Sequence, residues 1–441
     1  MNKRVMLSIA LFGAISAFAG MDRTKFIVGT YRFGDMIPGF RTEQHVKELK
    51  DAGIDCVYSM RPGTNAAAFY ATMDLFEKYG VGCITESGAD IGAGCPVRAY
   101  GSAKNGMPMR REVYEDVAKR FRPHPAIWGI DVGDEPNGMD MQHVGKAVEA
   151  CRELFPVQMR YVNLLPSYAR AATNTASIIE SQLGSLSYKD YIDDYCKYVP
   201  LDYISFDIYP YAKLKPKGVP ILFENLRIVS DACLRTGKSL WFVGQANTWW
   251  GRKPLAENCM RYQAYTAMAF GAETMVWACW TKGWWTNNVY STTGEKTVTY
   301  DRVKRVNAEL HFLGDKFMLF RRTATHLVGY AVRPEYLKGS GCISEDAAFT
   351  GWFRDIRAED GGPLLVAEMV PRAAASGSAI FVFASDDPYD EHPQQRTIRF
   401  IPHGDTVRAF GGSGPIPVRK GEDGVCTISL ASNNAALVAV K

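Results

Sequence analysis

The chain has 441 residues and a formal charge of +4 at pH 7, with 12% aromatic residues and nine tryptophans. A charge so close to balance, with Lys and Arg scattered along the chain, argues against nucleic acid as a partner. The length exceeds what one hydrophobic core usually serves, so we expect one large domain and one smaller domain.

The first residues, MNKRVMLSIALFGAISAFAG, combine Lys3 and Arg4 with an apolar run that ends in Ala17, Phe18 and Ala19. This is the pattern of a secretory signal, so residues 1–19 are expected to be a signal peptide that is cleaved after Ala19. We therefore expect an exported protein, either periplasmic or extracellular. No later apolar run is long enough to predict a membrane span in the mature chain.

Residues 25–317 alternate short apolar runs with amphipathic stretches. The apolar runs cover residues 25–31, 56–60, 80–87, 127–136, 159–166, 203–210, 239–245 and 274–280. Strand and helix alternating eight times predict a (β/α)8 barrel, which we place at residues 20–317. A doubly wound open sheet would alternate in the same way, but no glycine-rich phosphate loop follows the first strand.

The pattern changes after Phe317. Short β-type runs such as LLVAEMV, AIFVFAS, TIRFI and CTISLA are separated by Gly, Pro and Asp turns. They predict a small antiparallel, sandwich-like β domain over residues 318–441. One of its turns, DDPYDEH from Asp386, is compatible with calcium ligands or with a solvated acidic turn.

No cofactor or metal site is predicted. The seven histidines are dispersed and show no ligand spacing. The ten cysteines lie mostly inside apolar patterns, without the spacing of a metal knuckle or the density of a disulfide scaffold. We expect buried thiols and predict no pairing.

Barrel enzymes build their sites at the C-terminal ends of the strands. Those positions are polar here: Glu86, Asp131, Asp134, Glu135, Asn163, Asp207, Tyr209, Gln245, Asn247 and Trp280. A ring of carboxylates at one rim costs desolvation energy unless a function uses the charge. Glu135 is therefore the first catalytic candidate, whereas Asp131 is deep enough in its strand to serve as a hydrogen-bonding group inside the barrel.

The stretch WGIDVGDEPN, residues 128–137, resembles the strand-four motif of clan A glycoside hydrolases, the β-galactosidase and cellulase-like (β/α)8 enzymes. In that motif Asn-Glu-Pro supplies the general acid/base. YISFDIYPY at 203–211 and FGAETMVWACW at 270–280 are similar to the family 42 type. The resemblance implies an enzyme that cleaves O-glycosidic bonds of a carbohydrate substrate, with Glu135 as its general acid/base.

The chain departs from this family at two places. Asp134 stands where the family has the Asn that binds the sugar 2-hydroxyl. The family's nucleophile is a Glu at the end of strand seven, where LWFVGQANTWW (240–250) carries Gly244 and Gln245. Neither residue can attack an anomeric carbon.

Glycoside hydrolysis normally needs two carboxyl groups, and three explanations for the missing one stay open. In the first, the 2-acetamido group of the substrate attacks, Asp134 orients it and Glu135 protonates the leaving group. The adjacent Asp-Glu pair resembles the hexosaminidases of families 20 and 123. In the second, Asp207 or Glu86 has taken over as nucleophile or base. In the third, the barrel has lost catalysis and only binds carbohydrate.

Substrate assistance makes a structural demand, because neighbouring side chains on a regular strand face opposite ways. Asp134 and Glu135 can reach one sugar only if the strand end bulges or turns, which Gly133 and Pro136 favour. Aromatic rings then stack on the sugar or pack in the core. The predicted substrate-binding residues are Glu86, Asn163, Tyr209, Gln245, Asn247, Trp249, Trp280 and Trp284, and Trp250 and Trp285 are further candidates for the acetamido pocket.

Overall fold

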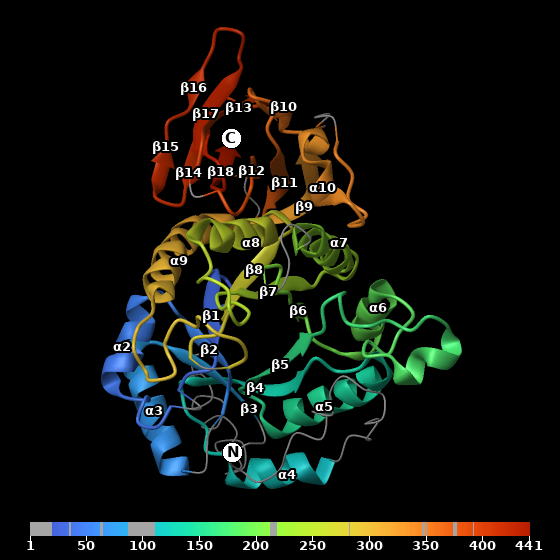
Figure 1. The fold of residues 1–441 in the computed structure, drawn as a ribbon, viewed down its shortest axis with the longest axis vertical. Coiled ribbons are helices and arrows are strands. Elements are labelled where there is room, and N and C mark those ends of the chain that lie inside the picture. Colours follow the sequence, from blue (N-terminus) through green and yellow to red (C-terminus); the bar gives the residue numbers. More distant parts are fainter. Residues whose placement is uncertain are drawn as a thin grey trace, which may run out of the picture. The chain divides into compact units, whose positions relative to one another are not determined.

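The structure is a computed structural model, and it describes residues 20–34, 37–61, 65–86, 111–211, 218–281, 283–345, 349, 351–373, 377–390 and 392–441. The predicted signal segment 1–19 lies outside them. Eight parallel strands close into a barrel in chain order, which confirms the predicted fold class (Figure 1). They are β1 (Ile27–Tyr31), β2 (Cys56–Met60), β3 (Gly82–Glu86), β4 (Ile127–Asp134), β5 (Met159–Leu164), β6 (Tyr203–Asp207), β7 (Ser239–Gln245) and β8 (Ala272–Ala278).

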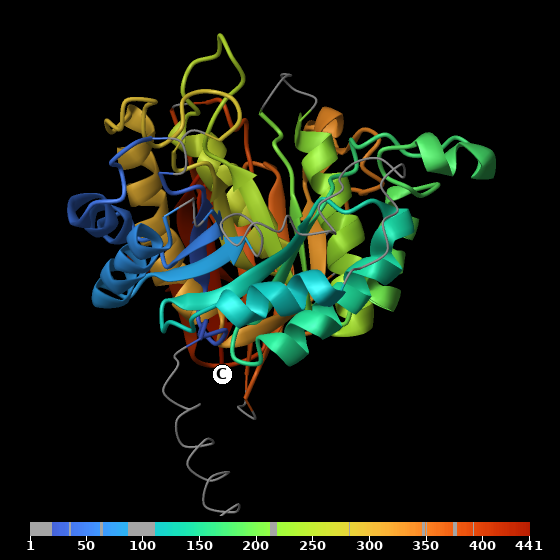
Figure 2. The ribbon, with the colours of Figure 1, turned by 90° about the horizontal axis from the view of Figure 1, so that it is seen from below.

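Helices follow the strands as the amphipathic stretches predict (Figure 2). They are α2 (Glu43–Asp51), α3 (Ala66–Tyr79), α4 (Arg111–Arg120), η2 (Gly138–Asp140), α5 (Met141–Leu154), η3 (Thr175–Glu180), α6 (Tyr188–Tyr198), α7 (Gly218–Thr236), α8 (Glu257–Ala269) and α9 (Val298–Phe317). The expected cap at Thr42 is present, since its side chain accepts a hydrogen bond from the His45 amide. Asn65 and Ser187 cap α3 and α6 in the same way.

The chain forms two compact units. The N-terminal unit comprises residues up to Arg23, Gly29–Leu165 and Ala169–Leu201, and so contains β2 to β5. The C-terminal unit comprises Thr24–Val28, Pro166–Tyr168 and Asp202–Lys441, and so contains β6 to β8 and everything after them. Strand β1 is divided between the two units after Val28.

The later part of the C-terminal unit is antiparallel, as expected from its turn-rich sequence. One sheet has the strand order β10-β13-β17-β16 and the other β15-β14-β18-β12-β11-β9. Their bounds are β9 (Phe320–Val328), η4 (Tyr330–Val332), α10 (Pro334–Leu337), β10 (Phe353–Ala358), β11 (Leu364–Pro371), β12 (Ser378–Ala384), β13 (Gln395–Pro402), β14 (Val407–Gly411), β15 (Gly414–Ile416), β16 (Arg419–Lys420), β17 (Cys426–Ala431) and β18 (Ala435–Val440). Apolar side chains from both sheets form one core, which includes Ile356, Val366, Val382 and Phe400.

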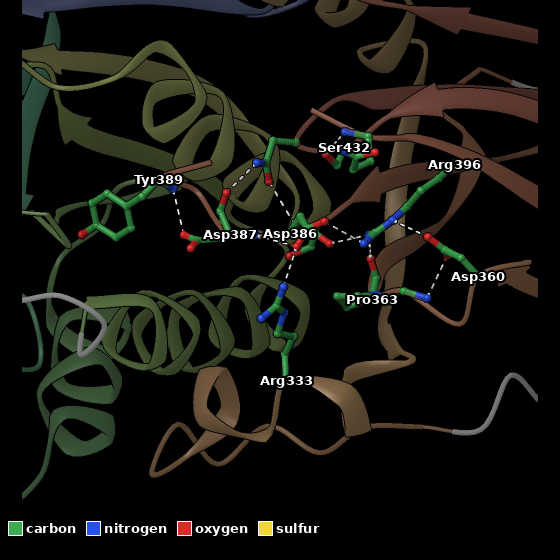
Figure 3. Close-up of polar contacts among 12 residues, drawn as sticks. Arg333, Asp360, Pro363, Asp386, Asp387, Tyr389, Arg396 and Ser432 are labelled. Atoms are coloured by element: carbon green, nitrogen blue, oxygen red, sulfur yellow. Dashed lines mark hydrogen bonds and ion pairs between the residues drawn. The ribbon is translucent and has the colours of Figure 1, made fainter. Parts of the chain in front are cut away.

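The acidic turn at Asp386 is organised by arginines (Figure 3). Asp386 forms ion pairs with Arg396 at 2.8 Å and with Arg333 at 3.0 Å. Arg396 is only 7% exposed and also pairs with Asp360 at 3.1 Å. Asp387 accepts a hydrogen bond from the Tyr389 amide. The first two aspartates therefore stabilise the β12–β13 connection, which differs from both a calcium loop and a solvated turn.

Nine of the ten cysteines lie in the described part of the chain. No disulfide joins the nine cysteines in this part of the chain. Among the same residues, no helix has the length and hydropathy needed to cross a membrane.

Candidate active site

The end of β4 carries the carboxylates that the motif indicates. β4 and β5 pair in parallel from Gly129 with Met159 to Asp134 with Asn163, and the register shifts between Asp131 and Gly133. One residue of β4, Val132, therefore has no counterpart on β5. Such a bulge bends a strand and re-aims the side chains that follow it. The irregularity expected next to Gly133 is thus present.

Glu135 leaves the strand in an unusual conformation. Its φ is 52°, in the left-handed region that residues other than glycine rarely adopt. The Glu135 amide donates to the carbonyl of Asn163 at 2.8 Å, and the Tyr191 hydroxyl donates to the carbonyl of Pro136 at 2.7 Å. Because these bonds hold the backbone on both sides, the local strain is compensated by the surrounding structure.

Asp134 and Glu135 are both partly exposed, whereas the four residues before them are buried. The left-handed turn breaks the strand alternation between them, so the two carboxylates are not forced to opposite faces. The Asn163 side chain donates to Oδ1 of Asp134 at 3.4 Å. The structure therefore brings together three of the predicted site residues, Asp134, Glu135 and Asn163.

A buried polar layer of the N-terminal unit involves Asp131. Asp131 is 3% exposed and accepts a hydrogen bond from the Ser59 hydroxyl. The hydroxyls of Tyr31 and Tyr161 lie 2.7 Å apart. Burial, Tyr161 and the charges of Asp134 and Asp131 raise the pKa of Tyr31 well above its usual value. Tyr31 thus stays a neutral hydrogen-bonding group, and Asp131 has the interior role that its depth predicts.

Backbone strain gathers at the ends of several strands of the N-terminal unit. Arg32, directly after β1, has φ 68°, and Ser59, in β2, has φ 49°. Seven non-glycine residues in the described part of the chain have a positive φ, and Arg32, Ser59 and Glu135 are the three that belong to the N-terminal unit. Residues in such conformations cluster at active sites and ligand clamps. This pattern marks these strand ends independently of the sequence motif.

Glu86, at the end of β3, is held by two arginines. Its carboxylate lies 3.4 Å from Nη1 of Arg32 and 3.1 Å from Nε of Arg61, and its side chain is only 4% exposed. The two cations compensate its buried charge. Its predicted roles in binding or catalysis stay predictions.

Several polar partners in this region were not predicted from the sequence. They are Tyr31, Arg32, Ser59, Arg61 and Tyr161. Three of them, Tyr31, Arg32 and Ser59, lie at the C-terminal ends of the first two strand runs. The rule that found Glu86 would have found them had it been applied to those runs.

In the C-terminal unit, Asp207 ends β6 and is 2% exposed. Rings of the loops after β6, β7 and β8 contact one another. The ring centroids of Tyr209 and Trp285 lie 5.1 Å apart, those of Trp285 and Trp249 5.7 Å, and those of Trp249 and Trp250 5.1 Å. Trp284 also contacts Tyr209, at 5.8 Å. Tyr209, Trp249, Trp284 and Trp285 are partly exposed, and Trp250 is 58% exposed.

The end of β7 has no carboxylate, and its glutamine is committed to the fold. Gln245 is fully buried, its Oε1 accepts from the Tyr211 amide at 2.9 Å, and its Nε2 donates to the Asn247 carbonyl at 2.8 Å. A side chain at Gly244 would place its Cβ 2.5 Å from Cε of Met275. Both positions are therefore packed against neighbouring groups.

Asn247 and Trp280 are also fully buried. The side-chain Nδ2 of Asn247 donates to the Trp284 carbonyl at 2.8 Å, which connects the loop after β7 to the loop after β8. The ring of Trp280 packs on Tyr290 and Tyr300. In this conformation these side chains shape the loops, and their predicted contact with substrate stays a prediction.

No group of three or more His, Cys, Asp or Glu residues with the arrangement of a metal site occurs in the described part of the chain. The end of β4 and its neighbours carry carboxyl, amide and hydroxyl groups. Such groups transfer protons and bind hydroxyl or amide groups of a ligand.

No protein-family model and no curated protein sequence matches the chain. Solved structures similar to it include a β-galactosidase from the psychrophilic Marinomonas ef1, at 12% identity and a TM-score of 0.47, covering 66% of this chain and 61% of that one. A glucosidase from Croceicoccus marinus is 12% identical with a TM-score of 0.45, covering 94% and 96%. Saccharomyces cerevisiae Gas2p in complex with laminaritriose and laminaritetraose is 11% identical with a TM-score of 0.43, covering 64% of each chain. At these values the similarities carry no argument about activity, and the (β/α)8 fold rests on the strand pairing itself.

Proposed function

We propose that this chain is an exported glycoside hydrolase in which Glu135 is the general acid/base. The observation that carries the proposal is the geometry of the β4 end. A partly exposed glutamate is held there in a left-handed conformation, next to Asp134 and its partner Asn163. Export is proposed from the signal-like sequence of residues 1–19.

The proposed reaction begins with proton transfer from Glu135 to the glycosidic oxygen as the bond from that oxygen to the anomeric carbon breaks. The carbonyl oxygen of a 2-acetamido group then bonds to the anomeric carbon and forms an oxazolinium ring. Asp134 orients the acetamido N–H and stabilises the positive charge of the oxazolinium ring. Water next attacks the anomeric carbon while Glu135 accepts its proton, which opens the ring and regenerates the enzyme.

Two features favour this route over a relocated carboxylate. Asp207 is 2% exposed, and Glu86 is bound by Arg32 and Arg61. Asp134, in contrast, is partly exposed and adjacent to the proposed acid. Substrate assistance is also consistent with the absence of a carboxylate at Gly244 and Gln245.

The proposal is tested on aryl glycosides that differ in the 2-substituent and in the leaving group. We expect release of the aryl alcohol from 2-acetamido sugars and none from the matching 2-hydroxy sugars. Glu135→Gln should slow turnover of poor leaving groups by about 10²- to 10⁴-fold and affect good leaving groups far less, because only the former need a proton. Glu422→Gln, which changes an exposed glutamate of the β domain, is the matched control.

Each outcome has a distinct meaning. Hydrolysis of 2-hydroxy sugars would assign the second carboxyl role to another residue and contradict substrate assistance. Equal turnover by Glu135→Gln and wild type on poor leaving groups would refute Glu135 as the acid. Saturable binding of oligosaccharides without hydrolysis would favour the carbohydrate-binding protein, an alternative that the carboxylate-free end of β7 keeps open.

A further inference from the structure

A cavity of about 170 Å³ lies at the N-terminal ends of β7 and β8, wholly within the C-terminal unit. Its charged lining residues are Lys238, Glu273, Arg321, Arg322 and Arg372. Four cations and one carboxylate give this lining a formal charge of +3. The cavity is at the opposite end of β7 from Gln245, and none of the proposed catalytic groups is among its lining residues.

The one carboxylate of the lining is already engaged. Glu273 accepts a hydrogen bond from the Ser239 hydroxyl at 2.8 Å through Oε2 and forms an ion pair with Arg372 through Oε1. Arg372 therefore balances the charge of Glu273. Glu273 does not neutralise the other cations of the lining.

Arg322 is the central residue of this cavity. Its Nη1 donates to the Thr325 hydroxyl at 3.0 Å and its Nη2 to the Ser230 carbonyl at 3.1 Å, and both acceptors are uncharged. Within the described residues, no carboxylate lies at ion-pair distance from this guanidinium. Burial lowers the pKa of Arg322 to about 10, which is the expected effect on a cation whose lost hydration is not fully replaced.

A side chain at Gly271 would crowd Nε, the third nitrogen of the Arg322 guanidinium. This glycine has φ +94°, and a Cβ at this position would lie 2.9 Å from Nε of Arg322. Both residues line the cavity, and in the described part of the chain Nε has no hydrogen-bond partner. The edge of a guanidinium group that carries Nε offers parallel N–H donors, which match two oxygens of an oxyanion.

We propose that this cavity is a binding site for a tetrahedral oxyanion, sulfate or phosphate, held by Arg322 and Arg321. The volume, about 170 Å³, is below the roughly 300–1,000 Å³ of sites for drug-sized ligands. The excess positive charge favours a dianion over a singly charged carboxylate. The oxyanion is either free in solution or carried as an ester on a sugar, and the proposal does not depend on glycosidase activity.

The test is calorimetric titration of the full-length protein with sodium sulfate, at ionic strength held constant with sodium chloride. Sulfate stabilises most proteins by exclusion from their surface, so saturable heat, rather than a rise in melting temperature, is the required readout. We expect one saturable site, with sodium acetate binding at least tenfold more weakly. Arg322→Met, which keeps the length without the charge, should weaken sulfate binding at least tenfold.

Arg322 also bonds to Ser230 and Thr325, so a second variant guards against misfolding. Arg321 is exposed, and Arg321→Ser should weaken sulfate binding several-fold without disturbing the fold. Arg408→Ser, at an exposed arginine of β14 outside the cavity, should leave it unchanged. No saturable heat, equal binding by wild type and Arg321→Ser, or tighter binding of acetate would overturn the proposal. If the site binds sulfate, a glucose 6-sulfate titration identifies the source: tighter binding than sulfate indicates an ester, and weaker binding indicates the free ion.

Discussion

Replacing Gln245 by glutamate would put a carboxyl group at the end of β7, where the resembling family has its nucleophile. The structure predicts that the result is a pH-sensitive fold rather than a new nucleophile. The side chain is fully buried and makes two hydrogen bonds. It accepts one from the Tyr211 amide and donates the other to the Asn247 carbonyl. An ionised carboxylate keeps the first bond and turns the second into a repulsion between oxygens 2.8 Å apart.

The magnitude follows from the linkage between protonation and folding. Burial and the Asn247 carbonyl should raise the pKa of the new carboxyl by about two to three pH units. Each pH unit corresponds to about 1.4 kcal/mol, so Gln245→Glu should lose about 3–4 kcal/mol of unfolding free energy as pH rises. The sign follows because the unfolded chain releases the proton first, so the loss begins near pH 4 and levels off above the pKa of the folded state.

The assay is urea unfolding at several pH values between about 4 and 8, with each variant compared to wild type at the same pH. Gln245→Met is the control, because it removes both hydrogen bonds without adding a titratable group. Its loss, about 1–3 kcal/mol, should be independent of pH. If Gln245→Glu followed the wild-type profile at every pH, the side chain would have to reach water, and the assignment of Gln245 to the fold would be wrong.

Two further outcomes are expected. Ser59→Ala removes the hydroxyl that donates to buried Asp131 and should lower the unfolding free energy by about 1–3 kcal/mol, while Ser429→Ala, at an exposed serine of β17, should change it little in the same denaturation experiment. Burial opposes a charge on His326, yet its contacts with Glu368 and Glu345 raise its pKa on balance. The ion pairs therefore stabilise the fold below the pKa of the unfolded histidine and are lost as pH rises through the pKa of the folded one. His326→Gln should be more destabilising at pH 5.5 than at pH 8.5, and an equal effect at both would contradict the assignment.

The barrel was predictable because its signals are local and repeated. Each apolar run and each amphipathic stretch carries its own period, and caps such as Thr42 mark the boundaries. The bulge before Glu135 was predictable for the same reason, since Gly133 and Pro136 are adjacent to it in sequence. Non-local contacts gave no such signal. That Arg32 and Arg61 meet at Glu86, or that Arg333 and Arg396 meet at Asp386, depends on strand register and loop path rather than on neighbouring residues.

Burial was the other property that the pattern of residue types could not supply. Gln245, Asn247 and Trp280 follow or end their strands as Glu135 does, yet all three are fully buried. A polar residue at a strand end is equally suited to meet a ligand and to satisfy backbone groups of the next loop. Only the path of the loops after β7 and β8 distinguishes the two cases.

The division of β1 between the two units has a consequence for folding kinetics. Residues Thr24–Val28 belong to the C-terminal unit, whose other segments are Pro166–Tyr168 and Asp202–Lys441. The C-terminal unit therefore cannot be completed by chain-local steps, because its first segment is separated from the rest by more than a hundred residues. Contacts over such sequence separations slow folding through the entropy of loop closure. Docking of Thr24–Val28 onto the rest of the C-terminal unit should therefore be a late event in folding.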